Sequence, residues 1–172
     1  RWPVLVLVAL VGVVTLAGAV VFLLPGDEDP PSSADDTGTT ATTLPDARTA
    51  AAEITDLVNA HREEEGLRPL PVDRQLAAEA TRQAQVAAEA DALVRSDLEA
   101  VGARHPGRWA ILGENVLSGD SVASVQQDSL ASSATRDNLD RGDWNVIGVG
   151  AALSGDGRTL FVVEYFAQRI EG

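Results

Sequence analysis

The chain has 172 residues and a formal net charge of −13, and it contains neither cysteine nor lysine. The absence of cysteine excludes a disulfide framework and thiolate chemistry. Residues from 48 onward carry 20 acidic and 12 arginine side chains, a net charge of −8, which disfavours nucleic acid and anionic lipid headgroups as partners because both require a basic surface.

The segment from Trp2 to Leu24 contains no charged residue and is rich in valine, leucine and alanine. As a helix it would be ~35 Å long, enough to cross a bilayer core of about 30 Å. Arg1 precedes it and acidic residues 27–29 follow it, so the positive-inside tendency predicts a cytoplasmic N-terminus. We expect a single-pass anchor in the cell membrane and an extracytoplasmic domain. Because no methionine begins the chain, we also expect a cytoplasmic segment upstream.

A cleaved signal peptide is the alternative for this segment, because Ala17-Gly18-Ala19 has the small residues of a cleavage site. Apolar residues continue from Val20 to Leu24, so that site would fall inside the hydrophobic run, which favours the uncleaved anchor. Both interpretations place the following domain outside the cytoplasm.

Residues 25–47 are predicted to form a disordered linker. Proline, serine, threonine, aspartate and glycine dominate the segment, which therefore buries too little apolar area to offset the entropy lost on ordering. As a flexible coil it would span on the order of 25–30 Å and hold the globular domain, residues 48–172, off the membrane.

Three helices are expected at the start and in the middle of this domain. The first runs from its N-cap, Thr49, to Glu65, and Gly66 suits the left-handed position after it. Its inward face is formed by Ile54, Leu57, Val58 and His61. The second follows an N-cap at Asp73 and ends near Asp97. A narrow stripe of small residues on it predicts close packing and comprises Leu76, Ala80, Ala84, Ala87 and Val94. The third runs from 121 to 132.

The strands are expected to form a small antiparallel sheet. Residues 144–151 and 159–166 are rich in β-formers, and Gly155-Asp156-Gly157 between them favours a hairpin turn. Together with a short strand after the loop 102–108, the order helix, helix, short strand, helix, strand, strand predicts the α+β class with helices covering the sheet. Gly148 and Gly150 are expected to allow close packing.

Several short motifs occur in a characteristic order and spacing. They are Asn59-x-x-Arg62, Gly66-Leu67-x-Pro69-Leu70, Gly113-Glu114-Asn115-Val116, Asn138-Leu139 and Ile147-Gly148-Val149-Gly150. Together they resemble the bacterial type of the CAP (SCP) domain, a superfamily that includes cysteine-rich secretory proteins, antigen 5 and plant pathogenesis-related proteins. The resemblance covers roughly residues 50–169 and implies a compact α-β-α sandwich, usually extracytoplasmic.

The resemblance also implies a site, and the chain departs from it. Many family members carry two histidines and one or two glutamates in a cleft that binds a divalent metal. Glu114 matches the signature glutamate, but Arg95 stands in the place of the first histidine, Thr135 in that of the second, and Ser132 in that of the second glutamate. We therefore expect a degenerate cluster without metal or other cofactor. The candidate binding residues are Glu114, Asn115, Arg95, Thr135 and Arg136.

The two histidines do not restore a metal site. Zinc requires about four ligands, typically with histidine or cysteine among them. His61 is expected to be partly buried and hydrogen-bonded on the first helix. His105 is expected to be solvated in its loop, too near Gly113 to replace the missing family histidine.

Glu114 is the one weak catalytic candidate. A general base requires a tuned pKa and a partner. Thr135, Arg95 and Arg136 are the neighbours that the resemblance offers, and an arginine beside a carboxylate lowers the carboxylate's pKa and pairs with it. We expect Glu114 to accept backbone N–H bonds and tie its strand to the following helix, as does Asn115. No G-x-S-x-G, phosphate-loop or dinucleotide motif is present in the sequence.

The sequence thus predicts a membrane-anchored, extracytoplasmic domain that acts as a non-enzymatic binding module in the cell envelope, for a lipid, a glycan or a protein. The alternative is a cryptic or metal-independent envelope hydrolase that uses Glu114. A scaffold without ligand is the third class.

Overall fold

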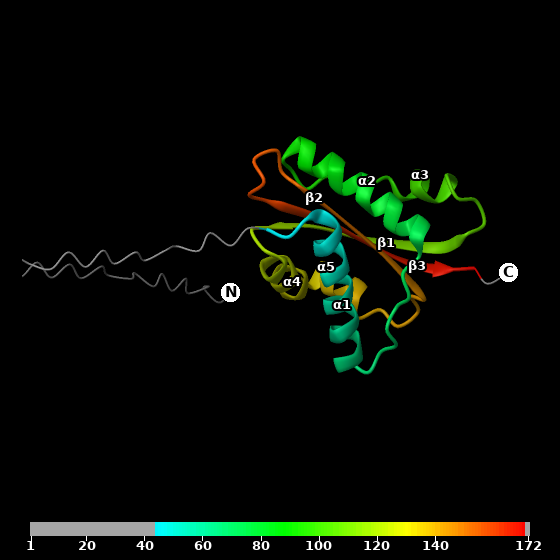
Figure 1. Ribbon diagram of the computed structural model, residues 1–172. Helices are drawn as coiled ribbons and strands as arrows, with labels where there is room; N and C mark the ends of the chain where they lie inside the picture. The colour runs from blue at the N-terminus through cyan, green and yellow to red at the C-terminus, as the bar shows by residue number, and fades with distance from the viewer. Residues whose placement is uncertain (1–43, 171–172) are drawn as a thin grey trace, which may run out of the picture. The chain divides into compact units, whose positions relative to one another are not determined.

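The computed structural model describes residues 44–170. Its elements, in chain order, are α1 (Ala47–Glu64), α2 (Arg74–Ala90), α3 (Leu98–Ala103), β1 (Trp109–Gly119), α4 (Val122–Ala131), α5 (Ser133–Leu139), β2 (Val146–Leu153) and β3 (Leu160–Arg169). The predicted α+β class is confirmed (Figure 1). The predicted anchor, residues 2–24, and all but the last four residues of the predicted linker, 25–47, lie outside the described residues.

The sheet has the strand order β1-β3-β2, and both neighbouring pairs are antiparallel. β2 and β3 form the predicted hairpin, in whose turn Gly157 has a φ of +69°, a left-handed conformation that glycine adopts without steric cost. β1 spans 11 residues and is longer than the short strand expected from the sequence. Because β3 is central, β1 and β2 form the two edges of the sheet.

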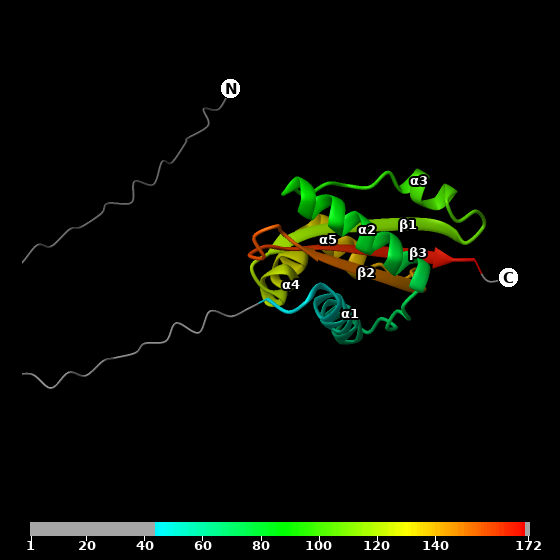
Figure 2. The ribbon, with the colours of Figure 1, turned by 45° about the horizontal axis from the view of Figure 1, so that its top comes forward.

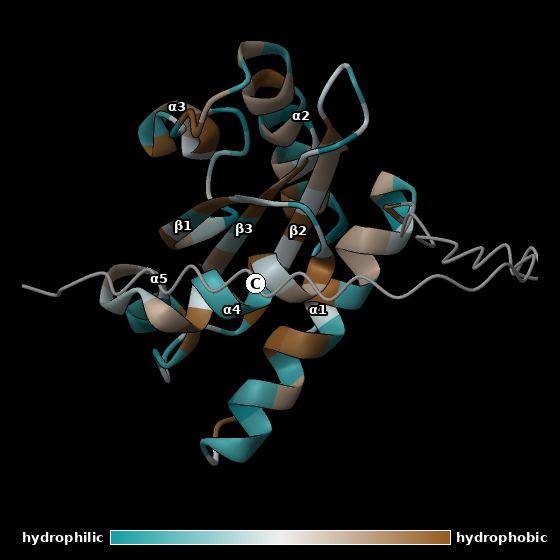
Figure 3. Cartoon of the chain, turned by 90° about the vertical axis from the view of Figure 1, so that its left-hand side faces the viewer, coloured by the Kyte–Doolittle hydropathy of each residue, from teal (hydrophilic) through white to brown (hydrophobic). Residues whose placement is uncertain are grey.

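Helices cover both faces of this sheet. In Figure 3, α2 and α3 lie on one side of the strands, and α1, α4 and α5 lie on the other. The buried apolar residues divide accordingly: one cluster joins α1 and α4 to Phe166, and a second joins Leu76 and Ala80 of α2 to Val163 and Tyr165. The predicted α-β-α sandwich is confirmed, and both faces of β3 are buried.

The first helix begins earlier than predicted. Its N-cap is Asp46, whose side chain accepts hydrogen bonds from the backbone N–H of Arg48 at 3.0 Å and of Thr49 at 3.1 Å. The prediction of Thr49 as the N-cap is wrong, because Asp46 is a stronger capping residue and lies one turn upstream. Leu44 packs against the core, so the end of the predicted linker belongs to the domain.

The described residues, 44–170, belong to one compact unit. Both apolar clusters lie inside this unit, and a domain that contains its own core is expected to fold by itself. Among residues 44–170, none of the helices is both long enough and apolar enough to cross a bilayer.

The second helix is capped by Asp73, as predicted, but it ends at Ala90 rather than near Asp97. Asp91 adopts a left-handed conformation with a φ of +48°, which stops the helix. The alanine stripe packs on β2 at its two glycines: a Cβ atom on Gly150 would overlap the backbone N of Thr81, and one on Gly148 would overlap that of Ala77. This confirms the predicted close packing.

Two short helices were not predicted from the sequence. α3 follows an N-cap at Asp97, and α5 follows a break at Ser132, where the backbone is extended. They have 6 and 7 residues, too few to establish a helical periodicity in the sequence. Both lie beside β1, one on each face of the sheet (Figure 3).

Candidate functional site

The signature residues Glu114 and Asn115 are neighbours on β1, so their side chains point to opposite faces of the sheet. Glu114 lies on the face covered by α2 and α3, where it is paired in register with Tyr165. Asn115 lies on the face covered by α5, paired in register with Glu164. The structure therefore divides the predicted binding residues between two faces instead of gathering them in one pocket.

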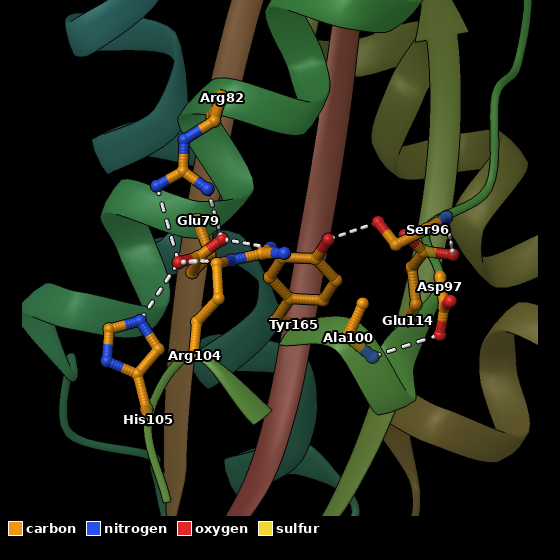
Figure 4. Close-up of polar contacts among 9 residues, drawn as sticks. All are labelled: Glu79, Arg82, Ser96, Asp97, Ala100, Arg104, His105, Glu114 and Tyr165. Atoms are coloured by element: carbon orange, nitrogen blue, oxygen red, sulfur yellow. Dashed lines mark hydrogen bonds and ion pairs between the residues drawn. The ribbon is translucent and has the colours of Figure 1, made fainter. Parts of the chain in front are cut away.

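The carboxylate of Glu114 is held by the segment between α2 and α3. The backbone N–H of Ser96 donates to both of its oxygens, at 3.0 and 3.1 Å (Figure 4), and the residue is only 6% exposed. Glu114 thus accepts backbone N–H bonds, as expected. The expected partner is wrong, however, because the bonds tie β1 to the chain before it rather than to the helix after it.

Ser96 also connects Glu114 to the central strand. Its hydroxyl shares a hydrogen bond with the Tyr165 hydroxyl on β3 (Figure 4). Burial raises the pKa of Tyr165 to about 12, so this phenol stays protonated at neutral pH. The hydrogen bonds from Glu114 through Ser96 to Tyr165 therefore fix the loop that carries Arg95, the residue predicted to stand in place of a family histidine.

The two predicted arginines lie apart from Glu114. Arg95 and Arg136 are exposed, and within residues 44–170 neither forms an ion pair with Glu114. Thr135 is buried, and its hydroxyl donates to the carbonyl oxygens of Ser129 at 2.6 Å and Ser132 at 3.0 Å. Thr135 therefore joins α4 to α5.

A cluster of polar and charged side chains around Glu79, on the α2 and α3 face, was not predicted. Glu79 is buried on α2 and accepts hydrogen bonds from three side chains: Arg82, Arg104 at 2.6 and 3.2 Å, and His105 at 2.9 Å (Figure 4). Burial alone would raise the pKa of Glu79, but the hydrogen bonds from Arg104, Arg82 and His105 outweigh burial and lower the pKa to about 2. Glu79 is therefore a fixed anion at neutral pH.

His105 differs from its prediction as a solvated loop residue. Its side chain is 22% exposed, is held by Glu79, and lies edge-on to Trp109 with 4.9 Å between the ring centroids. The Glu79 cluster borders an open cavity of about 480 Å³, which Tyr165 and Val86 also line. No local sequence pattern indicated this arrangement, because Glu79 and Arg104 are 25 residues apart.

The opposite face carries a second buried carboxylate. Glu164 on β3 is fully buried and accepts a hydrogen bond from Asn115 at 2.9 Å. Burial raises the pKa of Glu164 to about 7, although the hydrogen bond from Asn115 opposes this effect. Its second oxygen, Oε1, and the hydroxyl of Ser129 are buried with no hydrogen-bond partner among the described residues. Asn138 donates to Asn115 at 2.8 Å and completes this polar group beneath α5.

The two residues of the first motif, Asn59 and Arg62, hold neighbouring segments of the fold together. The side chain of Asn59 exchanges two hydrogen bonds with the backbone of Leu70, at 2.8 and 3.2 Å. Arg62 is buried and donates to the carbonyl oxygens of Leu139 at 2.5 Å and Arg141 at 3.1 Å. His61, 13% exposed, lies 2.7 Å from an oxygen of Asp140, which confirms the prediction of a partly buried, hydrogen-bonded histidine.

The residues predicted to stand at the family's metal positions do not fit a metal ion. Arg95 is a cation, the Thr135 hydroxyl is engaged with two carbonyl oxygens, and both oxygens of Glu114 accept N–H bonds. In the part of the chain that the structure describes, no three histidine, aspartate or glutamate residues lie close enough to hold a metal.

Comparisons with known proteins show the family and the fold of the chain. The family model described as the cysteine-rich secretory protein family, CAP, matches residues 55–166. The chain belongs to the CAP family. No curated protein matches it.

Several solved structures share this fold. An outer surface protein of Borrelia burgdorferi has a TM-score of 0.64 at 19% identity, over 72% of this chain and 95% of that one. An extracellular SCP-domain protein of Bacillus anthracis gives 0.57 at 24% identity, and a cysteine-rich secretory protein of Staphylococcus aureus gives 0.60 at 15%, each over 71% of this chain. The matched parts cover 41% and 39% of those two chains. These likenesses show a CAP fold.

Proposed function

We propose that this CAP domain is a non-enzymatic binding module of the cell envelope, whose ligand is a lipid, a glycan or a protein. The observation that carries the proposal is the state of Glu114. Its two oxygens are engaged by the backbone N–H of Ser96, and the positions of the family histidines hold Arg95 and Thr135. The signature carboxylate therefore supports the fold around the former metal positions.

Two further buried carboxylates, Glu79 and Glu164, also suit catalysis poorly. A general base must reach its substrate with a pKa near the working pH. Glu79 has a pKa of about 2 and is neutralised by its cationic neighbours. Glu164 has a pKa of about 7, but it is 0% exposed beneath α4 and α5, where a substrate has no access. Neither meets both requirements.

An activity assay tests the non-enzymatic part of this proposal. Residues 41–172 would be incubated with purified peptidoglycan and, separately, with casein, and soluble products would be measured with zinc and with a chelator. We expect no release above the buffer blank in any of these conditions. Turnover that Glu114→Gln abolishes would instead establish the hydrolase.

We also propose that residues 2–24 anchor the domain, with the N-terminus in the cytoplasm and the domain outside. The uncharged 23-residue run and the acidic residues 27–29 support this topology. The natural chain has no cysteine, so a single cysteine is a clean reporter. Gly155 lies in the exposed β2–β3 turn, and we expect Gly155→Cys in the full chain to react with a membrane-impermeant maleimide on intact cells. Labelling only after lysis would contradict the topology, and release of the chain by an alkaline carbonate wash would contradict the anchor.

A further inference from the structure

The outer edge of β2 is partly paired with another segment of the chain. β2 pairs with β3 on one side only. At its start, the other side is occupied: Ile147 donates its N–H to the carbonyl of Pro71 at 3.1 Å and accepts the N–H of Asp73 at 2.8 Å. Val72 thereby forms a parallel β-bridge with Ile147.

The rest of this edge has no such partner. Alternate residues of a strand direct their backbone groups to the same side, so Val149 and Ala151 present their N–H and C=O groups to the edge that Ile147 uses. Within residues 44–170, no backbone or side-chain group forms a hydrogen bond with these four groups. Val149 is only 6% exposed and Ala151 4%. Backbone polar groups in such positions are normally paired.

A groove of about 550 Å³ follows this edge between α1 and α2. Figure 2 shows β2 as an outer strand with these two helices on either side. Both walls carry small side chains, which are Ala47, Ala51, Ala52, Thr55, Ala77 and Thr81. The glycines of β2 contribute to the shape, because they allow the backbone of α2 to lie directly on the strand.

The charges of the groove also restrict its occupant. Arg48 and Asp56 are its charged lining residues, so the lining has no net charge, whereas the domain as a whole is acidic. Unpaired backbone donors and acceptors in register select a peptide backbone over a lipid chain or a glycan, because strand addition satisfies them in pairs. The space between narrow alanine walls favours small side chains.

We propose that this groove binds an extended peptide segment of a partner protein, with small, uncharged side chains, by strand addition to Val149 and Ala151. The bound segment would continue the pairing that Pro71–Asp73 begins at Ile147. From Ile147 to Leu153 the edge measures roughly 20 Å, at about 3.3 Å per residue. The inference rests on the proposed binding role and names its partner class, at the sheet edge opposite β1.

Amide NMR on residues 41–172 tests the proposal directly. The probe is a capped peptide of about eight residues with alternating threonine and valine, long enough to span the edge. We expect saturable shifts of the Val149 and Ala151 amide resonances, with a Kd below about 1 mM, and slower hydrogen exchange of both amides on binding. The absence of saturable shifts at these two amides would overturn the proposal.

Two controls separate strand addition from other contacts. The same peptide, N-methylated at alternate residues so that it cannot donate to the edge, should bind at least about tenfold more weakly. Ala52→Arg places a long side chain in the groove and should weaken binding similarly, whereas Ala60→Arg, also exposed on α1 but outside the groove, should not. Equal binding by the methylated peptide or by Ala52→Arg would overturn the proposal. These outcomes are independent of the activity assay, so the groove can fail while the non-enzymatic function stands.

Discussion

The backbone N–H of Ser96 donates to both carboxylate oxygens of Glu114, at 3.0 and 3.1 Å. This contact joins the edge strand β1 to the segment that connects α2 with α3. Arg95, which is predicted to replace a histidine of the family, lies in this same segment. Here the contact remains as a structural tie.

Glu114→Gln tests this structural role. Glutamine retains one acceptor oxygen but has no charge and places an amide group beside Ser96, so the charge-assisted bonds are lost. We expect the free energy of unfolding to fall by about 1–3 kcal/mol, measured by urea denaturation of residues 41–172. Glu99→Gln on α3, where the glutamate is exposed, is the matched control and should change stability by less than about 0.5 kcal/mol. Equal stability of the wild type and Glu114→Gln would show that the contact of Glu114 with Ser96 does not stabilise the fold.

The contact of α2 with β2 depends on glycine. Gly150→Ala adds a Cβ atom that overlaps the backbone of Thr81, so α2 must shift away from the sheet. We expect a loss of about 1–3 kcal/mol in unfolding free energy. Gly155→Ala, whose Cβ meets nothing within 4 Å, is the control. If both alanine variants unfold at the same urea concentration, the close approach of α2 is not required for stability.

Because Glu164 is buried, we expect the stability of the folded domain to fall as pH rises. Burial raises its pKa to about 7 from an ordinary value of 4.5, so the folded domain retains a proton that the unfolded chain releases. The contribution of Glu164 to stability is therefore constant below about pH 4.5, falls between about 4.5 and 7, and levels off above 7. The loss amounts to roughly 3 kcal/mol at about 1.4 kcal/mol per pH unit. We expect Glu164→Gln to lack this slope in urea denaturation at several pH values. If the wild type and Glu164→Gln lose stability equally between pH 4.5 and 7, Glu164 is not the source of the pH dependence.

For Glu79 we expect the opposite effect: the stability of the domain should fall as pH is lowered into the acid range. Its pKa is lowered to about 2 in the folded domain, so the stabilisation is present above the ordinary value of 4.5 and is lost as pH falls toward 2. Because Arg82 and Arg104 are about half exposed, solvent screening reduces the effect, and we expect about 1–2 kcal/mol. Thermal denaturation between pH 5 and 2 should show a shallower acid slope for Glu79→Gln than for the wild type. An unchanged slope would show that the cluster adds no net stability.

Local signals in the sequence predicted much of the fold. Asp73 caps α2 and Gly66 takes the left-handed position near the end of α1, because both effects depend on neighbouring residues only. The sequence does not predict α3 and α5, because these helices have too few residues to show a helical repeat of apolar side chains. The sequence consequently predicts Asp97 as the end of the second helix, whereas Asp97 caps α3.

The candidate site depended on contacts that no local pattern encodes. Glu79 meets Arg104 and His105 across 25 and 26 residues, and its place on an alanine-rich helix gave no sign of its partners. Glu164 did leave a signal, because it is the only charged residue in the apolar run from Leu160 to Ala167. In a sheet covered on both faces, such a carboxylate must be buried. The separation of Glu114 from Asn115 also follows from strand alternation.

Calorimetric titration of residues 41–172 with zinc tests whether structural contacts replace the metal site that the family resemblance implies. We expect no binding tighter than about micromolar, which corresponds to about −8 kcal/mol. Tighter, saturable binding with one zinc ion per domain, reduced by Glu114→Gln, would contradict it.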